Sequence, residues 1–109
     1  MRRSELWTLA GGPDYAGKPR PALIVQDDAF AALGSVVVCL LTSTESEAAP
    51  FRPRIAASAE NSLATMGWVM ADKVASVPRG RLGKRIGKLA AGDMAQVERA
   101  LLTLLGLAS

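Results

Sequence analysis

Short apolar runs of strand length, each ended by glycine, proline or polar residues, constrain the fold of this chain more than any other feature. Three such runs are residues 5–9, 21–26 and 36–41, and the last begins with three valines. Residues 11–14, GGPD, break the first run and open a loop to Pro19. A continuous apolar run that starts with β-branched residues is typical of a central strand buried on both faces. The sequence therefore predicts a mainly β fold.

The second half of the chain continues this pattern with shorter and more polar segments. The expected elements are one helical turn within residues 27–34, a loop over 42–47, a short edge segment through 54–55, one bent strand or two over 68–77 and a half-exposed strand over 85–89. Together with the first half, this gives five to seven short strands. Such a set forms a small barrel or a half-open sheet, and the sequence alone does not decide between them.

The last segment is the clearest helix. Asp93 is a plausible N-cap with Gln96 three residues later, and Gly106 can end the helix. Apolar side chains follow at helical spacing, at Met94, Val97, Leu101, Leu104 and Leu105. Leu102 and Leu107 widen this stripe. We expect the helix to pack on the barrel and to keep apolar surface for a partner.

The length and charge of the chain limit its size and its partners. Its 109 residues predict a single domain, residues 1–109, with a thin core that a second copy would help to cover. Lys and Arg number 13 against 10 Asp and Glu, and the pI is near 9.5. A pI above about 9 is typical of nucleic-acid-binding domains. A net charge of +3 fits a merely basic soluble protein equally well.

Missing residue types exclude several kinds of chemistry. The chain has no histidine, which excludes Ser/His/Asp triads, histidine-pair ribonuclease mechanisms and histidine-bound zinc. Its one cysteine, Cys39, lies in an apolar run and is interpreted as a buried thiol in a reducing compartment. No secretory signal and no run near ~18 apolar residues is found. We expect a cytoplasmic protein without metal or cofactor, away from membranes.

The segment Lys18-Pro19-Arg20-Pro21 is the first candidate site. The prolines stiffen the backbone where a loop meets a strand, so they restrict where Arg20 points. A guanidinium held in this way suits a phosphate, because it offers a charged, two-pronged donor. A surface arginine paired with a nearby carboxylate is the alternative.

Two further segments carry candidate residues. Thr42, Ser43 and Thr44 follow the buried strand, where hydroxyls can donate to a phosphate oxygen or cap their own loop. Asp72 and Lys73 interrupt an apolar run, which indicates either a bulge with an exposed binding patch or a solvent-facing ion pair.

Read in order, these segments resemble the MazF/PemK family of toxin endoribonucleases. The family's opening strand, R-G-E-[IVL]-[WY], corresponds to residues 3–7, RSELW. Its K-x-R-P-A-[LV]-[IV]-[LIV] strand corresponds to residues 18–25, KPRPALIV. An apolar strand with a threonine-rich turn, a segment like residues 71–74, ADKV, and a C-terminal helix complete the order. The resemblance spans nearly the whole chain.

This resemblance implies an SH3-like β-barrel with a C-terminal helix, an α+β fold that is mainly β. It also implies a homodimer that cleaves single-stranded RNA at short sequences without metal. A cognate antitoxin protein would lie across the RNA groove, and operator DNA would be reached only through that antitoxin.

The family's functional arginine falls on Arg20 and its functional threonine on Thr42, the expected catalytic pair. The expected RNA-binding residues are Lys18, Ser43, Thr44, Asp72 and Lys73. Two positions depart from the family pattern. Ser4 replaces the glycine of the opening motif, and the acidic residue before the functional arginine has no match other than Asp14.

Cleavage without metal or histidine is simplest when the 2′-OH of the RNA attacks the phosphorus. The products would carry 2′,3′-cyclic phosphate and 5′-OH ends, and Arg20 would stabilise the charge on the phosphorane. Arginine is a poor general base, so the base stays unassigned. Two alternatives remain. A gyrase poison of the related CcdB type would share the fold, although this chain lacks the tryptophan near its end. A non-catalytic nucleic-acid-binding or regulatory barrel is the other.

Overall fold

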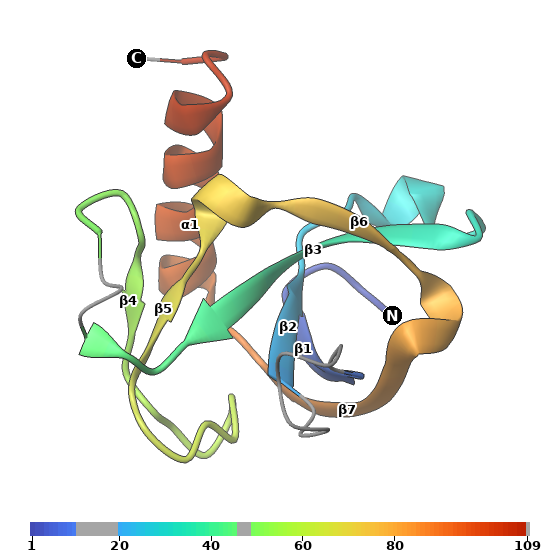
Figure 1. Cartoon of the computed structure of the whole chain (residues 1–109), viewed down its shortest axis with the longest axis horizontal. Helices are drawn as coiled ribbons and strands as arrows, with labels where there is room; N and C mark the ends of the chain where they lie inside the picture. Colours follow the sequence, from blue (N-terminus) through green and yellow to red (C-terminus); the bar gives the residue numbers. More distant parts are fainter. Residues whose placement is uncertain (11–19, 46–48, 109) are drawn as a thin grey trace.

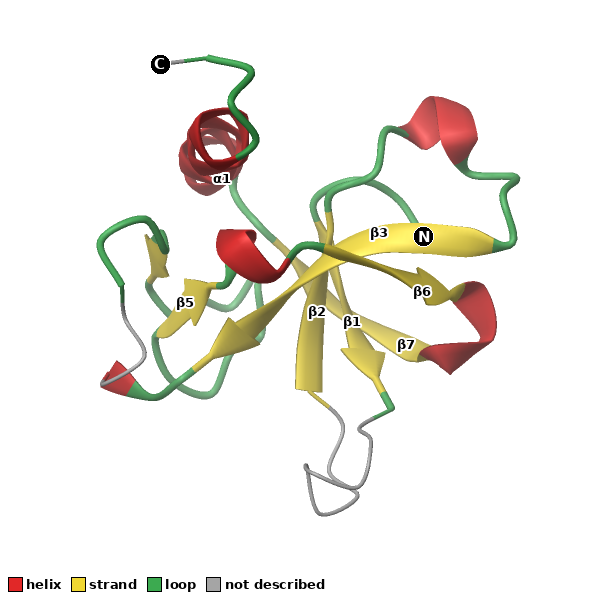
Figure 2. Ribbon diagram, turned by 45° about the horizontal axis from the view of Figure 1, so that its top comes forward, coloured by secondary structure: helices red, strands yellow, loops and turns green. Residues whose placement is uncertain are grey.

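The computed structural model describes residues 1–10, 20–45 and 49–108. In this part of the chain, an antiparallel sheet and one α-helix make up the fold (Figures 1 and 2). The strands are β1 (Glu5–Leu9), β2 (Arg20–Ile24), β3 (Ser35–Thr42), β4 (Arg54–Ile55), β5 (Gly67–Val69), β6 (Ala75–Pro78) and β7 (Leu82–Lys88). The helix is α1 (Ala91–Leu104), and the 3-10 turns of the described residues include η2 (Asp28–Phe30), η4 (Ala71–Lys73) and η5 (Arg79–Arg81).

Strand β3 organises the sheet because three other strands pair with it. The strand order is β4-β5-β3-β2-β1-β7, and β6 also pairs with β3. β2 pairs along one stretch of β3, with Ala22 opposite Leu40. β6 pairs with the first half of β3 and β5 pairs with its last two residues. The sheet curls into a half-barrel (Figure 2), which confirms the predicted mainly β barrel with a C-terminal helix.

The curled sheet separates two clusters of buried side chains. One, which includes Leu6, Leu23 and Cys39, packs against Met94 and Val97 of α1. The other lies on the opposite face of the same strands and contains Leu9, Ala22, Ile24, Val36, Val38, Val77 and Leu82. β3 contributes to both clusters, so the prediction that residues 36–41 are buried on both faces is confirmed.

Cys39 is fully buried, as the sequence predicted. Burial, assisted by the charge of Asp72, raises the pKa of the Cys39 thiol to about 12. The thiol is therefore protonated and unreactive at neutral pH.

The start of the helix differs from the prediction. α1 begins at Ala91, its N-cap is Ala90, and no side chain caps it. Asp93 lies inside the first turn instead, where a carboxylate favours the positive end of the helix dipole. A favourable first-turn acid and a capping acid look alike in sequence, which explains the error. The predicted end is correct, since Gly106 has a φ of +72°.

Two strand predictions are refined by the structure. The run 68–77 is two strands rather than one, because η4 interrupts it between β5 and β6. Thr42 is the last residue of β3 rather than the first of a loop, since it pairs with Trp68 of β5. The helical turn predicted within residues 27–34 is η2, and the edge segment at 54–55 is β4.

Over the described residues, no helix is long and apolar enough to cross a membrane.

Candidate active site

A pocket of about 340 Å³ lies where four segments of the chain converge. Its lining comes from Arg20 and Pro21 of β2, residues 41–44 around the end of β3, residues 62–67, which lead into β5, and Ile86 of β7. The start of β2, the end of β3 and the loop that precedes β5 all lie in the lower half of Figure 1. The pocket thus joins segments that are distant in sequence.

Arg20 and Thr42 are held in this pocket by strand pairing. Arg20 is the first residue of β2, lies opposite Leu9 of β1, and is half-buried. Thr42 is 4% exposed, and its hydroxyl oxygen accepts a hydrogen bond from the N–H of Thr44 at 3.2 Å. The capping turn that the sequence offered as an alternative is therefore present, and Thr42 also lines the pocket. Ser43 and Thr44 lie beside it on the same wall.

A second wall of the pocket, residues 62–67, is shaped by a buried asparagine that precedes it. Asn61 is 2% exposed. Its side-chain oxygen accepts from the N–H groups of Ser58 and Leu63, each at 3.0 Å, and its amide donates to the carbonyl of Ala56 at 2.9 Å. Ser62 follows with a φ of +57°, a left-handed conformation that turns the chain towards the pocket. These bonds fix the loop that leads into residues 62–67.

Strand β7 supports this wall from behind. The N–H of Lys88 donates to the carbonyl of Glu60 at 3.0 Å. A Cβ atom at Gly87 would lie 2.5 Å from the backbone oxygen of Asn61, so only glycine fits there. Sequence reasoning missed this wall. Its only signal is the polar stretch 58–62, and nothing in that stretch shows which strand it contacts.

Asp72 and Lys73 lie outside the pocket lining, in turn η4. The Arg52 guanidinium forms a two-pronged ion pair with Asp72, with Nε–Oδ1 and Nη2–Oδ2 distances of 2.8 Å. Arg52 is the main reason that the pKa of Asp72 is lowered. The RNA-binding role predicted for these two residues thus has no support from the pocket geometry. Lys18, like Asp14, lies outside the described residues.

Several arginines of the basic segment 79–88 hold the barrel together. Arg79 donates to the carbonyls of Leu33, at 3.0 Å, and Ala31. Arg81 donates to the carbonyl of Ala10 at 2.8 Å. These cations are therefore committed to structural contacts.

Glu5 links β1 to β7. Its carboxylate accepts from the backbone N–H of Arg2 at 2.7 Å, the indole of Trp7 at 3.1 Å and the guanidinium of Arg85 at 2.8 Å. Burial alone would raise the pKa of Glu5, but these donors and the N-terminal amine outweigh it and lower the pKa to about 2. Trp7 itself is only partly buried and packs against the second cluster of buried side chains.

The chemistry of the pocket suits a phosphodiester. A guanidinium and several hydroxyls converge on one cavity, and both kinds of group donate to phosphate oxygens. Within the described ranges, no three His, Cys, Asp or Glu side chains are grouped as metal ligands.

Residues 2–105 match the family described as the PemK-like, MazF-like toxin of type II toxin–antitoxin systems. The chain belongs to this family. A MazF relative from Mycolicibacterium smegmatis, described as a probable endoribonuclease, is 45% identical over 108 residues, which cover 99% of each chain. The endoribonuclease MazF9 of Mycobacterium tuberculosis is 30% identical, with 93% of this chain and 92% of that protein covered.

Solved MazF structures have the same fold. A mycobacterial endoribonuclease in complex with its cognate antitoxin superposes with a TM-score of 0.81 at 27% identity, covering 100% of this chain and 98% of the other. MazF from Deinococcus radiodurans gives a TM-score of 0.78 at 27% identity, covering 97% and 96%. This MazF-like chain is therefore a toxin endoribonuclease of a toxin–antitoxin system, which confirms the resemblance and disfavours the gyrase-poison and non-catalytic alternatives.

Proposed function

We propose that this MazF-like chain cleaves single-stranded RNA in the Arg20–Thr42 pocket, in the cytoplasm and without metal. The 2′ oxygen forms a bond to phosphorus and the bond from phosphorus to the 5′ oxygen breaks. The 2′-OH loses its proton and the departing 5′ oxygen gains one. The products carry a 2′,3′-cyclic phosphate and a 5′-OH.

The convergence of Arg20 and Thr42 on one cavity supports this proposal. Negative charge builds on the phosphorane oxygens in the transition state, and fixed donors aimed at that charge lower the barrier. Arg20 carries a permanent positive charge, so its role is electrostatic rather than that of a base. Thr42 orients the phosphate, and Ser43 and Thr44 contact the RNA from the same wall.

The test is cleavage of a long single-stranded RNA in excess EDTA, with mass spectrometry of the fragment ends. We expect discrete fragments with cyclic-phosphate and 5′-OH ends from the wild type. Arg20→Ala should cleave at least ~10²-fold more slowly, the loss typical of removing one transition-state donor. Arg54→Ala is the matched control, because Arg54 is an exposed arginine of β4 outside the pocket lining.

Near-normal cleavage by Arg20→Ala would contradict the assignment of this pocket. Fragments with 5′-phosphate ends would contradict attack by the 2′-OH. Dependence of the wild type on an added divalent ion would contradict the metal-free mechanism.

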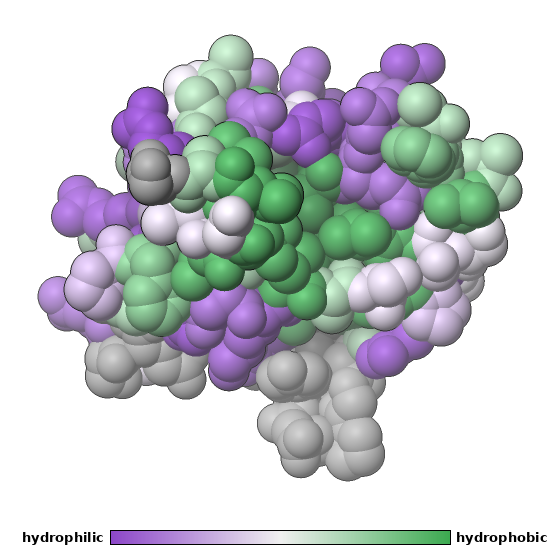
Figure 3. Space-filling model, turned by 90° about the horizontal axis from the view of Figure 1, so that it is seen from above, coloured by the Kyte–Doolittle hydropathy of each residue, from purple (hydrophilic) through white to green (hydrophobic). Residues whose placement is uncertain are grey.

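Two protein partners complete the proposal. Mycobacterial and Deinococcus radiodurans relatives have been solved with their antitoxins, and we infer that a cognate antitoxin covers the pocket of this chain. We also infer a homodimer, because the end of α1 and the residues after it expose large apolar side chains. These are Leu102, Leu104, Leu105 and Leu107. Apolar residues gather around the middle of the face seen from above (Figure 3).

A further inference from the structure

We propose that Met66 determines which base this nuclease accepts beside the phosphate that it cleaves. The inference rests on the proposed function, since it assumes that RNA occupies the Arg20–Thr42 pocket. The wall formed by residues 62–67 would then contact the base, and the wall formed by Arg20, Thr42, Ser43 and Thr44 would contact the phosphate.

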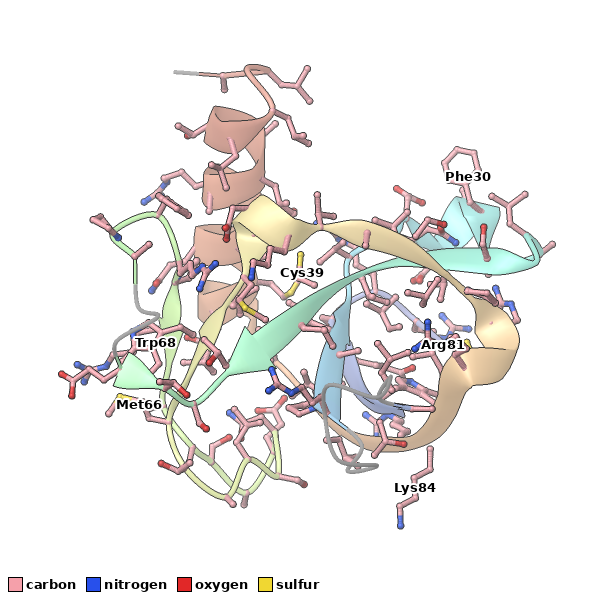
Figure 4. The ribbon with its side chains drawn as sticks, in the orientation of Figure 1. Phe30, Cys39, Met66, Trp68, Arg81 and Lys84 are labelled. Carbon is pink, nitrogen blue, oxygen red and sulfur yellow. The ribbon has the colours of Figure 1, made fainter. Side chains whose placement is uncertain are left out.

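Met66 is an exposed apolar side chain on a pocket wall. It lines the cavity that contains Arg20 and Thr42, yet 37% of it is exposed. Figure 4 places it just before β5, at the side of the molecule where β3 ends. An exposed thioether is flexible and polarisable, and it makes favourable contacts with aromatic rings. A nucleobase is such a ring.

Gly67, the next residue, brings the wall of residues 62–67 against β3. A Cβ atom at Gly67 would lie 3.3 Å from the carbonyl oxygen of Thr42 and 3.6 Å from the side chain of Leu41. Gly67 also pairs with Ile55 in the small β4–β5 ladder. Met66 is therefore tied to a backbone that touches Thr42, so a base held by Met66 belongs to a nucleotide next to the bound phosphate.

The position of Met66 is fixed from the other end of the wall as well. Asn61 satisfies the backbone groups of its loop, and Gly87 lets that loop pack directly on β7. A wall held at both ends keeps a defined distance from Arg20. A base is then selected by size, because the space between the walls is set by the protein.

The two walls also differ in chemistry, as expected if one contacts the phosphate and the other contacts a base. Arg20, Thr42, Ser43 and Thr44 offer charge and hydroxyls, which suit the phosphate that every nucleotide carries. On the wall of residues 62–67, Leu63, Ala64 and Met66 offer apolar surface beside the hydroxyls of Ser62 and Thr65. Phosphate contacts position a nucleic acid, whereas contacts to bases select its sequence.

The test maps every cleavage site on a long RNA of known sequence by sequencing the new 5′ ends. We compare the wild type with Met66→Ala, with the volume-conserving Met66→Leu, and with Phe30→Ala. Phe30 is an exposed apolar residue of η2, outside the pocket lining and far from Met66 in Figure 4. Hydrophobic pockets discriminate by about tenfold or more per group removed. Met66→Ala should therefore change the preference at one position beside the cut by about tenfold.

We expect Met66→Leu and Phe30→Ala to keep the wild-type site profile. An unchanged profile for Met66→Ala would overturn the role of Met66 while leaving the nuclease site intact. Equal loss of cleavage at all sites would also overturn it, because a specificity residue changes the ratio between sites. A wild type that cuts no RNA would instead refute the proposed function itself.

Discussion

Two serines adopt a backbone conformation that normally favours glycine. Within the described residues, Ser4 and Ser62 are the non-glycine residues with positive φ, at +76° and +57°. Ser4 occupies the position where the MazF/PemK opening motif has glycine. Its N–H donates to the carbonyl of Ile24 and its carbonyl accepts from Leu89, both at 2.9 Å, so β2 and the chain after β7 hold it in place. Serine in place of glycine at position 4 therefore costs conformational free energy, while the backbone hydrogen bonds at this position are kept.

Replacing Ser4 by glycine should stabilise the protein. A left-handed conformation costs a residue with a Cβ atom about 1–2 kcal/mol, and the greater freedom of glycine in the unfolded chain offsets part of this. We expect Ser4→Gly to raise Tm by several degrees in thermal unfolding, since ~1 kcal/mol corresponds to about 4–8 °C in a small domain. Ser76→Gly, in the exposed strand β6, is the control and should lower Tm. A decrease in Tm for Ser4→Gly would contradict the proposed backbone strain at Ser4.

At the level of single residues, the sequence predicted the pocket wall of Arg20 and Thr42 and missed the wall of residues 62–67. Arg20 was found because prolines flank it, and Thr42 because it follows an apolar run. Met66 and Asn61 carry no comparable signal, since their importance comes from a loop that packs on β7. The ion pair of Asp72 with Arg52, on the segment before β4, could not be predicted, because residue spacing does not show which distant cation lies beside a carboxylate. Local stiffness is visible in a sequence, whereas distant contacts are not.

Between elements, the Glu5 carboxylate joins β1 to β7 and should make stability depend on pH. Its pKa is about 2 in the folded protein against an ordinary value of 4.5. The stabilisation is therefore complete above pH 4.5 and is lost as the pH falls from 4.5 towards 2. Hydrogen bonds to a charged group contribute about 1.5–3 kcal/mol, so Glu5→Gln should be destabilised by roughly that amount at neutral pH.

The measurement is urea unfolding of the wild type and Glu5→Gln between pH 7 and pH 2. The difference between their free energies of unfolding should narrow below pH 4.5. Glu98→Gln is the control, because the Glu98–Arg3 ion pair is more exposed than the Glu5–Arg85 pair at its carboxylate. A difference that stays constant to pH 2 would show that the Glu5 network contributes nothing through its charge.

The elements themselves were largely predictable, and the errors have a common cause. Strands were found from apolar runs, but their ends depend on partners, as the pairing of Thr42 with Trp68 shows. The helix start was misplaced because Ala90 caps without a side chain. The ends of these elements are set by backbone pairing and capping, so the residue types at those positions do not identify them.

For the whole molecule, the apolar end of the chain predicts self-association. Leu105 is 58% exposed and Leu107 is 71% exposed, and α1 ends at the top of Figure 1, on the face shown in Figure 3. We expect a dimer in analytical ultracentrifugation. Leu105→Glu should weaken it at least about tenfold, because an interface that buries an unpaired carboxylate loses more than 1.4 kcal/mol.

Ala95→Glu is the matched control, since Ala95 is an exposed residue near the start of the same helix. Its dimer should be unaffected. Equal dimerisation of Leu105→Glu and the wild type would place the interface elsewhere on the molecule.

The pairing of β1 with β7 has a consequence for synthesis on the ribosome. Glu5 lies opposite Lys88, so the sheet cannot close until β7 has been translated. Ile86 of that strand also lines the cavity with Arg20. Translation proceeds at roughly 5–20 residues per second, and contacts between distant residues form late in folding. A nascent chain that lacks β7 therefore has no complete pocket, so we expect it to have no nuclease activity before β7 has been translated and paired with β1.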